Sequence, residues 1–472
     1  MQYKWIVISN TTVAILMASL DTNIVIIALP RIVSDLHASM IQTIWIVLSY
    51  GLVTASVLLS FGRLADMFGR VKLYNFGLVL FTISSFLCSF SQNGFELILL
   101  RMVQALGAAF LFSNSTAIIT DAFQAGERGK ALGLNQISIV IGSVLGLLLG
   151  GILTESLGWR SIFWVNVPIG TFAAVWARIK LRELGTVVGG RIDWLGNVVF
   201  VTSLVLIMLS ITLSSLQMIN IDYAILLLVS GFILIALFGF IESKIREPMF
   251  RLSLFKIKFF TAGNMTVFLN ALARGAVVLV MSLYLQGPTM RLGPLAVGLY
   301  LIPISFTIAT FGPISGLLYD RYGSMILTIV GLVVSAMGFL LLSQIQQKAD
   351  FTTLLLPLAL IGSGMGIFAA PNRSAIMNSV PPDQRGVAAG MSTTMLTIGN
   401  VLSLGMSFAI LTTIVPINEL ESIFLGNNAT TSINIVSNFL SSIHVIFYIS
   451  MLVLLVSIIP AVMEGKEKRI QH

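Results

Sequence analysis

The fold is decided by a short charged loop, Gly62-Arg-Leu-Ala-Asp-Met-Phe-Gly-Arg-Val-Lys72, which joins two long apolar segments. Its glycines permit a tight turn, and its charges keep the loop in water at one face of a membrane. A weaker copy, Gly316-Leu-Leu-Tyr-Asp-Arg-Tyr-Gly323, begins 254 residues later with the same internal spacing. The recurrence predicts a membrane protein in which a unit of several helices is duplicated.

Composition excludes a water-soluble fold. Of the 472 residues, 57% are hydrophobic and only 10% are charged, whereas soluble domains carry about 25% charged residues. Apolar runs of roughly twenty residues, long enough to cross the hydrocarbon core, occur fourteen times. We therefore expect an all-α integral membrane protein with fourteen spans, at residues 5–29, 41–61, 73–91, 97–120, 131–154, 161–179, 195–214, 222–241, 260–285, 295–318, 325–343, 352–372, 386–413 and 441–462.

A second pair of motifs repeats at nearly the same distance. Arg128-Gly-Lys-Ala-Leu-Gly133 and Arg385-Gly-Val-Ala-Ala-Gly390 each open an apolar segment, 257 residues apart. Two units of six helices leave two of the fourteen spans as an insert between them. We expect an N-terminal half over residues 1–182, an inserted pair with an amphipathic connector over 183–258, and a C-terminal half over 259–472. Duplicated halves are typical of transporters that rock about a central site.

The basic residues indicate how the chain is oriented. Lys and Arg concentrate in alternate loops, so that the predicted outer loops hold only Arg31, Arg160, Arg291 and Lys348. The positive-inside rule then places both termini in the cytoplasm of a cell-membrane protein. This distribution accounts for the net charge of +8, so the lipid bilayer is the expected surrounding and no nucleic-acid partner is expected. The single cysteine, Cys88, predicts neither a disulfide nor a cysteine metal site.

The loop beginning at Gly62 closely resembles the signature loop of the major facilitator superfamily, and the copy at Gly316 lies where that family has one. The resemblance implies the major facilitator fold, with two six-helix halves and here two inserted helices. It also implies that a charge cluster gates the transport cycle, with the residues Gly62, Asp66, Gly69, Arg70, Asp121 and Asp320. The alternative is that Asp66 only orients a helix end, which is compatible with a latch.

Two further stretches resemble the fourteen-span, drug:proton antiporter branch of that family, the multidrug exporter type. Trp159-Arg-Ser-Ile-Phe-Trp-Val-Asn-Val-Pro-Ile-Gly170 is similar to a motif of drug exporters, and the fifth span carries an antiporter motif, with Leu147 where the motif has proline. Its glycines are Gly133, Gly142, Gly146, Gly150 and Gly151. Ordinary close packing of helices is the alternative explanation of these glycines.

Charged side chains within spans are the candidate proton- and substrate-binding groups. Asp21 stands about sixteen residues, or about 24 Å, from the inner end of the first span, which places it in the outer half of the membrane. An isolated carboxylate there can bind a proton or a cationic substrate, which is the competition that an antiporter requires. A structural partnership of Asp21 with Arg101 or Arg274 is the alternative.

Arg101 and Gln104 belong to a stretch of the fourth span that resembles a family motif to which proton relay is assigned. Arg274, in the ninth span, completes the candidate set and is unexpected for an exporter of cations. Two positive charges against one negative charge within the spans argue against a preference for dications. Monovalent lipophilic cations, neutral amphiphiles and anionic compounds all remain open as substrates.

These features predict a proton-coupled secondary active exporter, an antiporter of small amphiphilic or drug-like compounds that works by alternating access as a monomer. Its expected partners are protons and a small-molecule substrate, with no cofactor and no metal. The alternative is an exporter of an endogenous lipid, of an anionic or of a neutral metabolite, or an uncoupled facilitator. An enzyme is not expected, because the three histidines form no His-Glu-x-x-His motif and no pair of acids lies within the spans.

Overall fold

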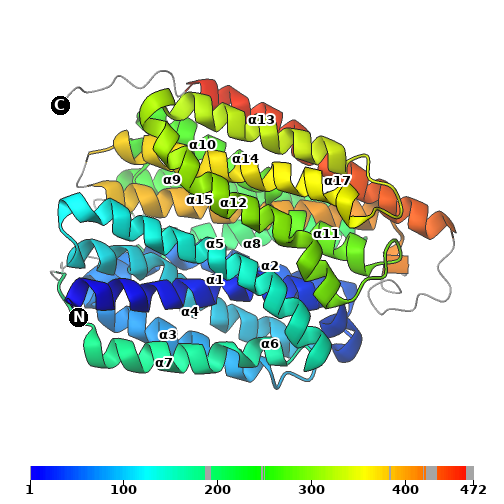
Figure 1. The fold of residues 1–472 in the computed structure, drawn as a ribbon, viewed down its shortest axis with the longest axis horizontal. Helices are drawn as coiled ribbons and strands as arrows, with labels where there is room; N and C mark the ends of the chain where they lie inside the picture. Colours follow the sequence, from blue (N-terminus) through cyan, green and yellow to red (C-terminus); the bar gives the residue numbers. More distant parts are fainter. Residues whose placement is uncertain are drawn as a thin grey trace. The chain divides into compact units, whose positions relative to one another are not determined.

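The computed structural model describes residues 2–185, 193–245, 248, 250–381, 384–417, 419–420 and 433–463. Over these ranges the chain forms α-helices joined by short connections and one 3-10 turn (Figure 1). The helices are α1 Tyr3–Leu36, α2 Met40–Phe68, α3 Arg70–Cys88, α4 Gly94–Ala122, α5 Ala125–Ser156, α6 Ser161–Trp164, α7 Asn166–Lys180, α8 Trp194–Ser215, α9 Ile221–Lys244, η1 Leu252–Lys256, α10 Lys258–Arg274, α11 Val277–Gln286, α12 Pro294–Tyr322, α13 Ser324–Leu342, α14 Phe351–Asn378, α15 Arg385–Ile414 and α17 Ile433–Met463.

Fourteen helical segments of the described chain are long and apolar enough to cross a membrane, which confirms the predicted number. Two of these spans differ from the uninterrupted helices expected. The sixth span, Ser161–Lys180, consists of α6 and α7, and the ninth, Lys258–Gln286, is interrupted at Gly275 and Ala276 between α10 and α11.

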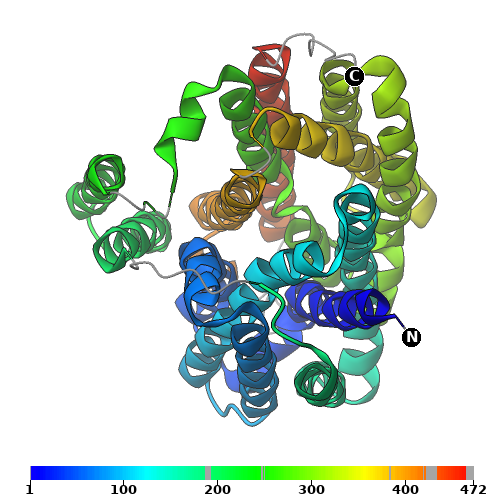
Figure 2. The same cartoon turned by 90° about the vertical axis from the view of Figure 1, so that its left-hand side faces the viewer.

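The chain divides into two compact units. The first comprises Met1–Met249, Leu292–Leu299 and Ile417–Ala429, and the second comprises Phe250–Arg291, Tyr300–Pro416 and Thr430–His472. The division into two six-helix halves and an inserted pair remains a prediction. Within the first unit, α8 and α9 lie side by side (Figure 2), and Asn197 on α8 donates a hydrogen bond to Ser60 Oγ on α2.

Local sequence fixes the ends of several helices. Ser39 and Gln42 form a reciprocal capping box at the start of α2, and Asn93 caps α4 by accepting from Glu96 N at 2.9 Å. The joint between α2 and α3 is a single residue, Gly69, with a φ of +103°. Since side chains disfavour this backbone region, glycine is required for a turn this tight.

Helices α1 and α5 of the first unit pack closely against each other. A Cβ added to Gly142 on α5 would stand 2.5 Å from the carbonyl oxygen of Leu16 on α1. A Cβ added to Gly146 would stand at the same distance from the carbonyl oxygen of Leu20. Gly150 continues this face one turn later, against Ile24. Glycines at every fourth position therefore let the two backbones approach, as small residues do between membrane helices, and Asp21 is held beside this contact.

Candidate functional site

A fully buried polar network surrounds Asp21 in the first unit. Asp21, Gln104 and Asn166 have no exposed surface, and the side chain of Arg101 is 2% exposed. The four residues come from α1, α4 and α7, so three helices contribute to one cluster. The surrounding spans shield it from water.

Each carboxylate oxygen of Asp21 accepts from amide or guanidinium groups. Oδ2 accepts from Nη1 of Arg101, which also donates to Gln104 Oε1 at 2.7 Å. Oδ1 accepts from Gln104 Nε2 at 2.9 Å and from Asn166 Nδ2 at 2.8 Å. The carboxylate is therefore held by one cation and two neutral donors, which is the arrangement that allows a charge to remain buried.

The Arg101 guanidinium also lies over an aromatic ring. Its Cζ lies 4.3 Å from the centroid of the Tyr50 ring on α2, and the Tyr50 hydroxyl donates to Ala18 O at 3.4 Å. A cation over an aromatic face in a water-poor site is stabilised by the ring quadrupole. Tyr50 thus supports Arg101 without competing for Asp21.

Two buried polar atoms of the network have no hydrogen-bond partner within the described residues, Arg101 Nε and Asn166 Oδ1. One is a donor and the other is an acceptor. An unpartnered buried polar atom costs about 1–3 kcal/mol. The network therefore has one donor and one acceptor that are not used in this arrangement of the described residues.

These contacts correct one expectation. Asp21 is not an isolated carboxylate, because it forms an ion pair with Arg101, as the alternative in the sequence analysis allowed. Arg274 is not a member of this network. It lies at the end of α10 in the second unit, where its Nε donates to Asn270 Oδ1 at 2.6 Å.

The structure brings together three residues of the predicted charge cluster, at the α2–α3 joint and the end of α4. Arg70 Nε donates to Asp66 Oδ1 at 2.8 Å, and Arg70 Nη1 donates to Asp121 Oδ1 at 2.6 Å. Gly62 lies one helical turn before Asp66, and a Cβ there would meet only Ser113 Cβ, at 3.8 Å. Asp320, the acid of the repeated loop that corresponds to Asp66, has a side chain outside the described residues.

One residue of this cluster is missing from the sequence analysis. Glu183, in the segment that follows α7, accepts from the backbone N–H of Arg70 at 2.8 Å and from that of Val71 at 3.0 Å. A carboxylate at the first turn of α3 accepts from N–H groups that have no partner within the helix, and its negative charge interacts favourably with the helix dipole. Its sequence position, after a span and among basic residues, indicates only a loop.

The five glycines of the antiporter motif do not share one role. Gly142, Gly146 and Gly150 pack on α1, and a Cβ on Gly151 would come within 2.7 Å of Leu295 Cα. Gly133 has nothing within 4 Å of its Cβ position. The motif is therefore a packing face for most of its length, and Gly133 lies outside that face.

The exporter-like motif at Trp159 forms contacts at the other end of the unit. Trp159 Nε1 donates to Asp35 Oδ2 at 2.8 Å, and Arg160 donates to the same oxygen and, at 3.1 Å, to Ser91 O. The motif also contains Asn166, which reaches Asp21. Its presence in a quoted motif was the signal that could have placed Asn166 in the site.

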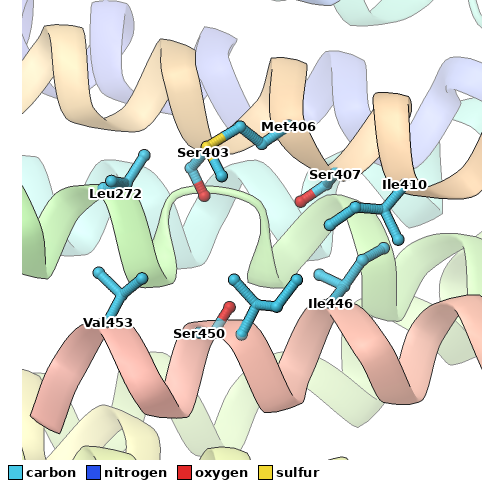
Figure 3. A pocket seen from close by; sticks show the side chains of 9 residues that line it. Leu272, Ser403, Met406, Ser407, Ile410, Ile446, Ser450 and Val453 are labelled. Atoms are coloured by element: carbon cyan, nitrogen blue, oxygen red, sulfur yellow. The ribbon is translucent and has the colours of Figure 1, made fainter. Parts of the chain in front are cut away.

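The second unit contains a small crevice between α15, α17 and the end of α10 (Figure 3). Its lining is mostly aliphatic, with three serines, and consists of Leu272, Ser403, Met406, Ser407, Ile410, Ile446, Ile449, Ser450 and Val453. Figure 3 shows Ser403 over the break in the ninth span, where its Oγ accepts from Ala276 N at 3.0 Å.

Comparison with known proteins assigns the family. The family model of the Major Facilitator Superfamily matches residues 11–404. The riboflavin transporter RibZ of Clostridioides difficile is 33% identical over 412 residues, which are 86% of this chain and 88% of that protein. Multidrug resistance protein 3 of Bacillus subtilis is 28% identical over 429 residues, which are 89% of this chain and 82% of that protein.

A solved structure shows the same fold. The inward-facing, unoccupied form of a bacterial homologue of the human lysosomal transporter Spinster matches with a TM-score of 0.68 and 16% identity, over 98% of this chain and 97% of that one. At this identity the likeness concerns the fold alone. With its fourteen spans and a family match over most of its length, the chain belongs to the Major Facilitator Superfamily of multi-pass membrane transporters.

Proposed function

We propose that the protein is a proton-coupled exporter that exchanges protons for small amphiphilic compounds by alternating access. The observation that carries this proposal is the buried network in which Asp21 pairs with Arg101 among membrane spans. Ionisable residues within spans are costly and mark proton or substrate pathways in transporters. Relatives named as multidrug resistance proteins and transporters, at 27–29% identity, support a drug-like cargo.

Proton coupling follows from the chemistry of the ion pair. While Asp21 is ionised, its charge holds Arg101, and Gln104 and Asn166 donate to the same carboxylate. A proton bound to Asp21 neutralises the carboxylate and leaves the guanidinium without a counter-charge. Because an unpaired buried charge is strongly unfavourable, Arg101 must then find another acceptor or expose itself to a cavity. Protonation at one atom thereby favours a different packing of α1 against α4.

The inner cluster is proposed to act as a latch for that change. Arg70 joins the α2–α3 joint to Asp121 at the end of α4. An ion pair between helix ends stabilises one arrangement of the helices. It is lost when α4 moves relative to α2, so the packing can switch between two states. The proposed orientation, with both termini in the cytoplasm, puts this latch at the inner face, and the proposed active form is the monomer.

A second candidate function is transport of an endogenous metabolite. It is favoured by the relative named as a riboflavin transporter, which is 33% identical over 86% of this chain. The two candidates differ in cargo, while the fold and the network are the same.

Proton release from reconstituted vesicles tests the proposal. Wild type, Asp21→Asn and the control Asp222→Asn, which changes an exposed acid at the start of α9, are each supplied with ethidium, with an amphiphilic carboxylate or with riboflavin. We expect cargo-dependent proton movement in wild type and control, and its loss in Asp21→Asn. Equal proton exchange by all three proteins contradicts coupling through Asp21. Movement with riboflavin alone identifies the second candidate as the function.

A further inference from the structure

Arg274 is a cation deep in the ninth span. Asp21 has an ion-pair partner in Arg101, whereas Arg274 has none among the described residues. It stands sixteen residues after Lys258, where α10 begins, or about 24 Å along the helix. No acid of the described chain forms an ion pair with it, and its only hydrogen bond is the one from Nε to Asn270 Oδ1. A guanidinium at this depth costs a few kcal/mol unless a partner or a polar cavity meets it.

The group that holds Arg274 adds a further unused donor. Asn270 is 1% exposed, and its Nδ2 has no hydrogen-bond partner in the part of the chain that the structure describes. The orientation of this amide is fixed, since Arg274 Nε can only donate and must therefore face the oxygen. The remaining guanidinium N–H groups and the Asn270 Nδ2 are consequently all donors, and the complementary ligand group must be an acceptor.

The backbone at this position is unusual as well. The span breaks immediately after Arg274, where Ala276 N donates to Ser403 Oγ at 3.0 Å. Asn400 packs against the break, because a Cβ on Gly275 would come within 2.7 Å of its Cα. Interrupted helices in transporters occur where the backbone lines a binding site.

Arg274 lies next to the position that corresponds to Asp21 in the duplicated sequence pattern. It follows Asp21 by 253 residues, next to the 254 that separate the two signature loops. Asp21 is thus matched by Arg101 in one repeat, whereas Arg274, one residue before the counterpart of Asp21 at the offset of the loops, is matched by no acid of the described chain. The group that would complement Arg274 is therefore an anion.

On the basis of the proposed transport function, we infer that the substrate is an amphiphilic organic anion whose charged end binds Arg274 and Asn270 at the α10–α11 break. A carboxylate satisfies both donors, since guanidinium binds carboxylate oxygens in bidentate fashion and an amide N–H₂ reaches a remaining lone pair. The aliphatic crevice in Figure 3 is separate from this group. Leu272 precedes Arg274 by two positions, which turns it to about the opposite side of α10.

Binding of matched probes tests the inference. The probes are dansyl-aminoundecanoate and its analogue with a trimethylammonium group in place of the carboxylate, measured with protein in vesicles of zwitterionic lipid. The variants are Arg274→Gln, Arg274→Lys and Asn270→Asp, with Arg31→Gln as a control at an exposed arginine. Asn270→Asp is the sharpest, because it keeps the guanidinium and supplies it with an internal anion.

We expect Arg274→Gln and Asn270→Asp to weaken binding of the carboxylate probe about ten- to a hundredfold, the effect of losing one charge-assisted hydrogen-bonded pair. Arg31→Gln should bind as wild type does, and Arg274→Lys, which keeps the charge but loses the bidentate geometry, should bind more tightly than Arg274→Gln. The inference is overturned if wild type prefers the trimethylammonium probe, or if Arg274→Gln and Asn270→Asp bind the carboxylate probe as wild type does. Binding without pH-driven transport contradicts only the proposed export function, so the two failures are distinguishable.

Discussion

The Asp21–Arg101 pair is the residue-level feature on which the proposed proton coupling depends. Because the two charges are buried together, the effects of mutating them should not be additive. Removing one partner from a buried pair costs about 3–5 kcal/mol, because the other charge remains unpaired, whereas removing both is much less damaging. We predict that Arg101→Ala destabilises the protein by this amount and that Asp21→Ala with Arg101→Ala destabilises it less than either single change. Thermal unfolding in detergent of the four proteins measures the cycle. Additive losses would show that the charges do not depend on each other.

Sequence reasoning identifies Asp21 and Arg101 and allows their pairing, but it cannot choose between Arg101 and Arg274 as the partner of Asp21. Each is conspicuous, because a charge within an apolar span is rare. Their contact joins positions 80 residues apart on α1 and α4, and it depends on which faces of those helices meet. Asn166 and Tyr50 were harder to find, since a neutral amide or phenol in a span more often makes an ordinary interhelical contact.

At the scale of elements, the packing of α5 on α1 controls the position of Asp21. A Cβ on Gly146 would stand 2.5 Å from Leu20 O, next to Asp21, so Gly146→Ala must push α1 away. We predict a loss of about 1–3 kcal/mol of stability, as overpacked interiors show, together with weaker proton coupling. Gly133→Ala is the matched control from the same motif. With no atom within 4 Å, it should gain up to about 1 kcal/mol from helix propensity.

Unfolding temperature and cargo-dependent proton release check both glycine variants. Equal behaviour of Gly146→Ala and Gly133→Ala would contradict the packing role. The sequence shows the glycine spacing but does not distinguish these two positions, since the motif treats all five glycines alike. The break after Arg274 is another element-level feature that hydropathy misses, because Lys258–Gln286 is apolar enough over its length to be taken as one span.

At the scale of the whole molecule, the fourteen spans were predictable because hydrophobic length alone sets them. Alternation of basic loops then predicts which face each loop occupies. Cys88 makes this testable, since the single cysteine has no exposed surface and should remain unlabelled by a membrane-impermeant maleimide. Wild type therefore supplies the background for cysteines introduced one at a time.

The α8–α9 pair gives the most demanding test of topology, because it is the predicted insert. Leu184, Met218 and Lys256 are exposed and lie before, between and after these helices. If both helices cross the bilayer, we predict that Met218→Cys is labelled from outside intact cells, whereas Leu184→Cys and Lys256→Cys react only after permeabilisation. Labelling of all three from one side would mean that the pair does not span. The reversed pattern would instead place the basic loops, the Arg70 latch and both termini outside, which the positive-inside rule opposes.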